Sequence, residues 1–476
     1  MITVPGRILS APSVQYKNRK ARLQSASWNL DRMQFSKPGG FPAWAVLIVN
    51  STARPALNMN PQAPSFVPKS LFHTFVRQLS MYTVSIPDSW ETQELCVDSA
   101  TVSQRASGVK ELKSAFGKMV ADRARFAIVV LPTFDRWLYS RIKYYGDVEY
   151  GIHTVCCIGD KLQKYRGYPA DEDRALAQYI GNLALKVNIK AGGRNHIVQD
   201  TSNVMMKELA HTMLVGIDVT HPSPGSSEGA PSIAGVVASY DEYLQQWPAS
   251  LRRQQGRKEM VETPLYEMLK ERLVTWTRMN KGALPKNIIV YRDGVSEGQY
   301  QAVLDQELPQ FKKVFKDLYG GPLKWPKLAI IVVGKRHHTR FYPTKVEDAA
   351  PRTFNPQPGT VVDRGVTDAV LYDFYLQAHD GLQGTTRPAH YVVIYDGLKL
   401  KANALQNFTH TLCYSFNRAT KAVSICPPAY YADLLCERAR MYLYNTMNEN
   451  NNVSDAAENA WTGQIHPNLR DSTFYI

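Results

Sequence analysis

The sequence has few cysteines and no long apolar run. Its six cysteines form no Cys-x-x-Cys pair and no zinc-type spacing, so we expect buried thiols in a reducing compartment. Apolar runs such as AWAVLIV and FAIVVL are far shorter than the ~20 residues that a membrane-spanning helix needs. The segment MITVPGRILSAPSVQY has no apolar core of the kind found in signal peptides. We therefore expect a cytoplasmic protein without a membrane partner.

Acidic side chains are also fewer than basic ones. The chain has 56 Lys and Arg against 42 Asp and Glu, a net charge of +14. Residues 1–210 hold 27 basic and 16 acidic side chains (+11), which leaves 29 and 26 (+3) for residues 211–476. The first part is therefore the better candidate for binding a polyanion. The alternative is that the basic excess only aids solubility.

Apolar segments that read as buried strands alternate with helical patterns through the first part of the chain. This alternation predicts a doubly wound parallel sheet. The predicted strands are 43–50, 125–132 and 152–158, and the predicted helices are 70–82, 108–120, 136–147 and 177–193.

A second unit begins with two apolar segments around a turn rich in Pro, Gly and Ser, which predicts a hairpin over 211–241. Helices are expected at 264–280, 298–319 and 428–445, with a strand before Asp293. Residues 1–33 lack periodicity and are expected to be a linker segment. Their abrupt start suggests part of a longer protein.

Two carboxylates follow strands that look built for burial. The segment MLVGID ends on Asp218, and NIIVYRD ends on Asp293. An ionised carboxylate among buried strands is costly unless it is paired or binds a metal. Hard cations such as Mg²⁺ take carboxylate and water ligands, so together the two strand ends predict a shared metal site. For each aspartate alone, the alternative is a cap on the following turn.

Two further acids are candidates for the same site. Asp433 lies in the first turns of a predicted helix, where the helix dipole favours an acid with or without a catalytic role. Glu259 and Glu262 lie in the polar segment RRQQGRKEMVE, which alone would be taken as solvated surface. Local sequence does not choose between these two glutamates.

Pairs of residues four apart on predicted helices offer a cationic site. Tyr139 and Lys143 form one pair, and Lys186 and Lys190 form the other. Residues with this spacing share a helix face. Two lysines and a tyrosine ring could neutralise a terminal phosphate and stack on a nucleobase. The alternative is exposed lysines on amphipathic helices.

Long motifs in this order resemble the PIWI domain of eukaryotic Argonaute proteins. They are GIDVTHP, PSIAGVVAS, YRDGVSEGQ, KRHHTRF, DFYLQAH, GTTRPAHY and ICPPAYYADLLCERAR. Upstream, YSRIK and NLALKVNIKAGG look like the neighbouring MID domain, and APSVQY resembles the preceding linker. The match runs from about residue 34 to the end, and it is similar to a filamentous-fungal Argonaute of the quelling type.

The resemblance implies an α/β protein with two domains. Residues 34–200 would be a Rossmann-like MID domain with a parallel sheet, and residues 201–476 an RNase H-like PIWI domain with a mixed sheet. Asp218, Asp293 and Asp433 match the metal-binding acids of the family. Glu259 matches the mobile glutamate that completes the catalytic set.

The resemblance also implies a pocket for the 5′-phosphate of a guide RNA. The residues that match it are Tyr139, Lys143, Lys186, Lys190 and, from the last PIWI helix, Arg438. Val155 stands where many relatives have a hydrogen-bonding Gln, and the neighbouring Thr154 hydroxyl is expected to substitute.

We therefore expect a silencing protein that binds a small guide RNA and cleaves a complementary target RNA with two Mg²⁺ or Mn²⁺ ions about 4 Å apart. Guide RNA, target RNA and silencing-complex proteins would be its partners. The alternatives are a non-cleaving guide-binding scaffold and an RNase H-like nuclease that needs no guide. Because no amino-terminal or PAZ domain is recognised in the sequence, we expect weak cleavage by this chain alone.

Overall fold

A computed structural model describes residues 2–40, 43–54, 56, 79–80, 82, 91–163, 174–200, 202–447 and 461–476. The chain divides into two compact units. Unit 1 holds Met1–Asn29 and His196–Glu437, and unit 2 holds Leu30–Asn195 and Arg438–Ile476. The helix predicted at 70–82 lies outside the described residues except at positions 79, 80 and 82. No helix in the described part of the chain is long and apolar enough to span a membrane.

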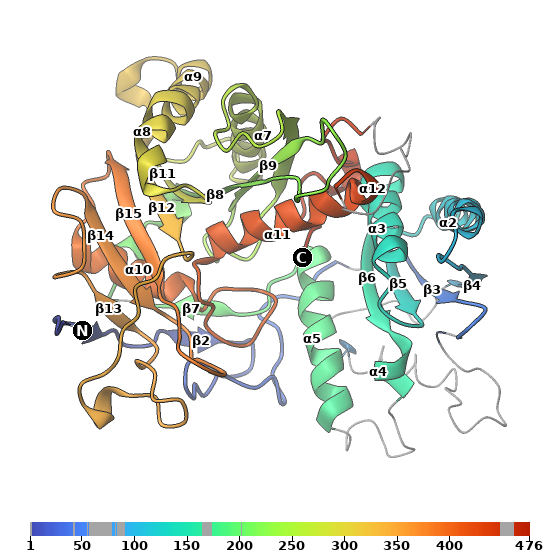
Figure 1. Ribbon diagram of the computed structural model, residues 1–476, viewed down its shortest axis with the longest axis horizontal. Coiled ribbons are helices and arrows are strands. Elements are labelled where there is room, and N and C mark those ends of the chain that lie inside the picture. Colours follow the sequence, from blue (N-terminus) through green and yellow to red (C-terminus); the bar gives the residue numbers. More distant parts are fainter. Residues whose placement is uncertain are drawn as a thin grey trace. The chain divides into compact units, whose positions relative to one another are not determined.

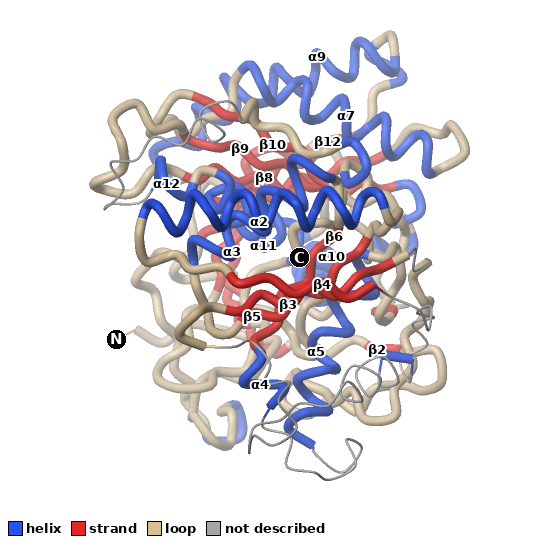
Figure 2. The backbone as a smooth tube through the Cα atoms, turned by 90° about the vertical axis from the view of Figure 1, so that its right-hand side faces the viewer, coloured by secondary structure: helices blue, strands red, loops and turns tan. Residues whose placement is uncertain are grey.

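Unit 2 is built on a parallel sheet of four strands. Their order across the sheet is β4 (Glu91–Cys96), β3 (Trp44–Asn50), β5 (Phe126–Leu131) and β6 (His153–Ile158). Figure 2 shows β3, β4 and β5 running side by side. All six residues of β5 are buried, as expected for a parallel strand covered on both faces. The predicted parallel sheet is confirmed.

Capping residues fix where the helices of unit 2 begin. Thr101 and Gln104 form a capping box ahead of α2, and the Asp135 side chain accepts a hydrogen bond from the Leu138 N–H (2.9 Å) at the start of α3. Helix α3 continues into a π-helical turn, η1, which ends at Gly151 in the left-handed region (φ 66°). The helical elements of the unit 2 sheet are α2 (Val102–Ala121), α3 (Arg136–Tyr144), η1 (Tyr145–Tyr150), α4 (Gly159–Gln163) and α5 (Arg174–Lys190).

Unit 1 contains a mixed sheet of nine strands. Strands β8, β11 and β12 are parallel neighbours, whereas the other pairs are antiparallel. The β8–β9 pair confirms the predicted hairpin. The order is β1 (Arg7–Ile8), β13 (Thr360–Val362), β14 (Tyr372–Gln377), β15 (Ala389–Asp396), β12 (Lys327–Gly334), β11 (Asn287–Asp293), β8 (Thr212–Thr220), β9 (Ser232–Ala238) and β10 (Ala249–Gln254).

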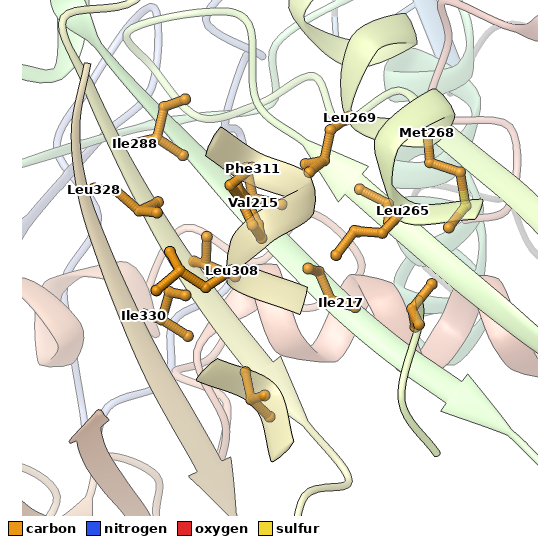
Figure 3. Packing of buried hydrophobic residues seen from close by; sticks show 14 of the residues in the cluster. Val215, Ile217, Leu265, Met268, Leu269, Ile288, Leu308, Phe311, Leu328 and Ile330 are labelled. Carbon is orange, nitrogen blue, oxygen red and sulfur yellow. The ribbon is translucent and has the colours of Figure 1, made fainter. Parts of the chain in front are cut away.

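Alternate residues of β8 face different helices. Val215 and Ile217 point into the main core cluster with Leu265 and Leu269 of α7 (Thr263–Met279), as Figure 3 shows. Gly216 faces the other way, because a Cβ at this position would lie 1.8 Å from the Pro428 carbonyl oxygen at the start of α11. Helix α11 (Pro427–Tyr442) therefore packs directly on β8 (Figure 1).

The helix predicted over 298–319 is not continuous. It is divided into η3 (Glu297–Gln299), α8 (Tyr300–Ala302), a π-helical turn η4 (Val303–Glu307) and α9 (Leu308–Tyr319). Pro309 has no N–H to donate, and its ring crowds the carbonyl one turn earlier. The proline therefore accounts for the break in the α-helical pattern at η4.

The first residues of the chain contain strands that the sequence did not reveal. Strand β1 pairs with β13, and β2 (Ser13–Gln15) pairs with β7 (Ile197–Gln199). Strands of two and three residues are too short for a period to be read. The compact units also place Arg438–Ile476 with the parallel sheet, whereas the family-based boundaries, which stay a prediction, assign those residues to the PIWI domain.

The remaining helical elements are short apart from one helix of unit 1. They are α6 (Val204–Lys207), η2 (Leu209–His211), η5 (Pro322–Lys324), η6 (Val346–Asp348), α10 (Ala402–Leu412), α12 (Tyr444–Met447) and η7 (Pro467–Leu469). The predicted carboxy-terminal helix is thus represented by α11 and α12.

Candidate functional site

Strand pairing in unit 1 places two of the predicted acids side by side. In the parallel register of β8 and β11, Arg292 lies opposite Ile217. Asp293 and Asp218 are the next residues on each strand. Since Ile217 points into the core under α7, the alternation along a strand directs Asp218 toward α11. The thiol of Cys436, on α11, lies 3.4 Å from the Asp218 carbonyl oxygen.

The three predicted metal-binding acids lie within electrostatic range of one another. Burial, and then the charge of Asp218, raises the pKa of Asp293 to about 7 and that of Asp433 to about 6. Burial also raises the pKa of Asp218, although the Arg292 guanidinium opposes the shift. Strands β8 and β11 and helix α11 thus place the three carboxylates close enough for their charges to interact.

The Glu259 carboxylate belongs to the same cluster. One of its oxygens lies 2.8 Å from His221 Nε2, and the other accepts a hydrogen bond of 2.9 Å from Arg292 Nη1. A Cβ on Gly294 would lie 2.9 Å from Glu259 Oε1 and 3.3 Å from Asp218 Oδ1. These two acids therefore converge on Gly294, which has a left-handed backbone (φ 83°).

The geometry also distinguishes the two glutamates that local sequence left open. The Glu259 side chain is only 13% exposed, so it is not solvated surface. The Glu262 side chain is 42% exposed and forms an ion pair with Lys258 at 2.8 Å. Glu259 is therefore the member of this segment that lies at the acid cluster.

The donor atoms of the cluster suit a hard divalent cation. Like charges held close together favour the uptake of a proton or a cation, and carboxylate oxygens are ligands that Mg²⁺ takes. Among the described residues, no group of three or more His, Cys, Asp or Glu side chains is arranged as a metal-binding shell. The carboxylates are thus ligands of the type that Mg²⁺ takes, but they do not form such a shell as they lie in this structure.

Sequence reasoning missed three residues of this site, namely His221, Arg292 and Glu307. His221 bridges Glu259 and Ser232, with 2.8 Å to each. Arg292 is fully buried, and its guanidinium lies 3.0 Å from the buried Glu307. An arginine inside the apolar strand NIIVYRD was a usable signal, since a buried charge requires a partner.

A second candidate site lies within unit 2. Lys143 is buried, and its ammonium group donates hydrogen bonds to the Thr154 carbonyl (2.9 Å) and hydroxyl (2.8 Å). The same ammonium group lies 5.2 Å from the centre of the Tyr139 ring. The predicted Tyr139–Lys143 pair thus shares a face, and Thr154 lies with it. Val155 is also buried.

Lys190 and Arg438 add two buried basic groups to this site. The Lys190 ammonium group donates to the Phe474 carbonyl, and Arg438 donates to Asp147 (2.7 Å) and to the Tyr475 carbonyl (3.1 Å). Burial, with Arg438 and Lys143 nearby, lowers the pKa of Lys190 well below its ordinary value.

Lys186 and Lys190, which were predicted to share a helix face, differ in burial. Lys186 is half-buried, and its charge also contributes to the lowered pKa of Lys190. Lys143, Lys190 and Arg438 are instead almost fully buried, so the interpretation as exposed surface lysines does not hold for the first two. Sequence reasoning missed Asp147, which lies on the π-helical turn η1 and accepts hydrogen bonds from Arg438 and Tyr442 (2.7 Å each).

Comparisons with known proteins agree with this architecture. Residues 126–444 match the family model described as the Piwi domain. Protein argonaute MEL1 of Oryza sativa subsp. japonica is 32% identical over an alignment that covers 100% of this chain and 46% of that protein. The chain thus spans less than half the length of this relative.

Solved structures of Argonaute proteins share the fold. The C-terminal lobe of a budding yeast Argonaute superposes with a TM-score of 0.81 at 26% identity, covering 99% of this chain and 95% of that one. Kluyveromyces polysporus Argonaute with a guide RNA gives 0.79 at 27% identity, covering 99% and 54%. The MID-PIWI domains of N. crassa QDE-2 give 0.62 at 28% identity, covering 93% and 100%.

Proposed function

Because this chain belongs to the Piwi family and forms the MID–PIWI lobe of a eukaryotic Argonaute, we propose that it is a small-RNA-guided endoribonuclease. Unit 2 would hold the 5′-phosphorylated end of a guide RNA, and the acid cluster of unit 1 would cleave a paired target RNA. The observation that carries the proposal is the meeting of Asp218, Asp293 and Asp433, from three separate elements, within electrostatic range.

The cations of unit 2 suit a terminal phosphate. Lys143, Lys190 and Arg438 are buried together, and Asp147 is the carboxylate that pairs with Arg438. A terminal phosphate carries about two negative charges, which would offset this local excess of positive charge. The Tyr139 ring is half-buried beside these cations and would stack on the first base. A structure of Kluyveromyces polysporus Argonaute with a guide RNA supports this class of ligand.

The acid cluster would supply the cleavage chemistry. Asp218, Asp293 and Asp433 would hold Mg²⁺ or Mn²⁺, and Glu259 would complete the set. The bound ions would activate water and stabilise the charge that develops at the phosphodiester. The expected products carry a 3′-hydroxyl and a 5′-phosphate. Base pairing with the guide would select the target, so the protein itself needs contacts mainly with backbone and shape.

Several finer features are part of the same proposal. We place the protein in RNA silencing of the fungal quelling type, in the cytoplasm, with silencing-complex proteins as partners. The motif resemblance supports the fungal assignment, and the six free cysteines support a reducing compartment. The alternative function is a guide-binding scaffold that does not cleave.

A single-turnover cleavage assay tests the proposal. The chain is loaded with a 5′-phosphorylated guide and mixed with a matched RNA target in Mg²⁺. We expect cleavage by the wild type and by the control Asp305→Asn, which changes an exposed acid, and none by Asp293→Ala. Equal cleavage by Asp293→Ala would disprove the role of this acid. Guide binding without cleavage in either Mg²⁺ or Mn²⁺ would favour the scaffold.

A further inference from the structure

The Arg292 guanidinium joins the segments that carry two of the acids. It is completely buried. Its Nη1 atom donates to Glu259 Oε1 (2.9 Å) and to the Asp293 carbonyl (2.5 Å), and its Nη2 atom donates to the Glu259 carbonyl (2.8 Å). One side chain therefore ties the loop that holds Glu259 to the end of β11. The position of this side chain must itself be fixed.

Glu307 fixes it from the other side. The Glu307 carboxylate is 1% exposed and accepts hydrogen bonds from Arg292 Nε (3.1 Å) and Nη2 (3.0 Å). It also accepts a hydrogen bond of 3.0 Å from the Val261 N–H, two residues beyond Glu259. Glu307 thus contacts both the arginine and the backbone of the loop that the arginine holds.

The local helix geometry explains how Glu307 reaches this position. Glu307 is the last residue of the π-helical turn η4, and Pro309 follows two residues later. A π-turn inserts an extra residue into a helix, which changes the direction of the side chains around it. Asp305, on the same turn, is exposed and accepts a hydrogen bond from Gln301 at 2.8 Å. The two acids of one turn therefore have different surroundings.

We propose that Glu307 is a positioning residue that holds the 256–262 loop, and with it the Glu259 carboxylate, at the acid cluster through Arg292 and the Val261 N–H. This role rests on the proposed nuclease function. In Glu307→Gln, Arg292 loses a charged partner, and a single amide oxygen remains to accept hydrogen bonds from both Arg292 and the Val261 N–H. The loop would then open more often, and Glu259 would be out of place during cleavage. Substituting a residue that hydrogen-bonds to a metal-site residue commonly lowers activity by about 10–100-fold.

The test compares Glu307→Gln with the matched control Asp305→Asn. Hydrogen–deuterium exchange is first followed in the metal-free protein. We expect faster exchange in segment 256–262 of Glu307→Gln, with β8 and β12 unchanged, and no change in Asp305→Asn. Unchanged exchange in this segment, or a uniform increase over all of unit 1, would overturn the proposal. If Glu307→Gln does not fold, Glu307→Asp keeps the charge with a shorter reach, and the same local increase is expected.

Cleavage and binding then separate positioning from general stability. For Glu307→Gln we expect a single-turnover rate about 10–100-fold lower, with unchanged affinity for the 5′-phosphorylated guide and unchanged KM for the target. A wild type that cleaves and a Glu307→Gln variant that cleaves equally fast would overturn the positioning role alone. A wild type that does not cleave would overturn the nuclease function, while the exchange result would still decide whether Glu307 holds the loop.

Discussion

Asp293, the last residue of β11, lies beside Asp218 of the adjacent parallel strand β8, and their charges repel each other. In the register of β8 and β11, the residues just before them are direct partners. After burial, the charge of Asp218 is the main cause of the raised pKa of Asp293, which reaches about 7. This repulsion between the two aspartates is expected to make the site sensitive to pH and to cations.

The raised pKa of Asp293 predicts a loss of stability with rising pH in EDTA. The folded state retains a proton up to a pKa of about 7, whereas an unfolded aspartate releases it near pH 4. The stabilising contribution is therefore complete below about pH 4 and is lost as the pH rises through 7. Melting curves should show a smaller decrease in Tm from pH 5 to pH 8 for Asp293→Asn than for the wild type. Equal decreases would contradict the coupling between Asp218 and Asp293.

Divalent cations should reverse this destabilisation. A ligand that binds the folded state alone raises its stability by about 2.7 kcal/mol at 100 times its Kd. We expect Mg²⁺ at pH 8 to raise the Tm of the wild type, and EDTA to remove the effect. Asp218→Asn should respond much less, because it replaces a charged carboxylate of the cluster by a neutral amide. An equal response of both proteins would place the cation elsewhere.

Replacing Lys143 by methionine should weaken binding of a 5′-phosphorylated guide about 10–100-fold, since a hydrogen bond to a charged group contributes about 1.5–3 kcal/mol. Binding of the 5′-hydroxyl guide should change little. Fluorescence anisotropy with the two guides measures both. Lys113→Met is the matched control, because Lys113 is an exposed lysine of the same unit, in an ion pair with Glu149 (3.2 Å). Similar effects of the two substitutions would argue against a phosphate pocket at Lys143.

Gly294→Ala should impair cleavage without affecting guide binding. The glycine has a φ of 83°, and an added Cβ would press on the Glu259 carboxylate at 2.9 Å. Left-handed backbone also costs an alanine about 1 kcal/mol or more. Gly298→Ala is the control, because its Cβ would meet no atom within 4 Å. Single-turnover rates compare the two variants. Normal cleavage by Gly294→Ala would show that cleavage does not require Glu259 at its position in this structure.

Sequence predicted the parts of the fold that have a local pattern. Buried parallel strands such as β5 and β11 are continuous apolar runs, and Asp218 and Asp293 were expected to share a site because each follows such a run. The expected strand end at Asp218 was wrong, since β8 continues to Thr220, whereas Asp293 does end β11. The two- and three-residue strands β1 and β2 have no pattern of their own, because their hydrogen-bond partners lie far along the chain.

The contacts that hold the site are also non-local. Arg292 and Glu259 are 33 residues apart, and Arg438 and Asp147 are 291 apart. No local spacing encodes such pairs. The family resemblance identified Glu259 and Arg438, but Arg292, Glu307 and Asp147 appeared only with the fold. A buried charge in an apolar strand indicates that a partner exists without showing which residue it is.

The most direct test of guide-directed cleavage is to map the cut while moving the guide. Two 5′-phosphorylated guides, offset by one nucleotide on the same target, are loaded separately into the wild type, and the products are sized to the nucleotide. We predict that the cut moves by one nucleotide with the guide and disappears in Asp293→Ala. A cut that stays in place, or that forms without a guide, would contradict the proposed function.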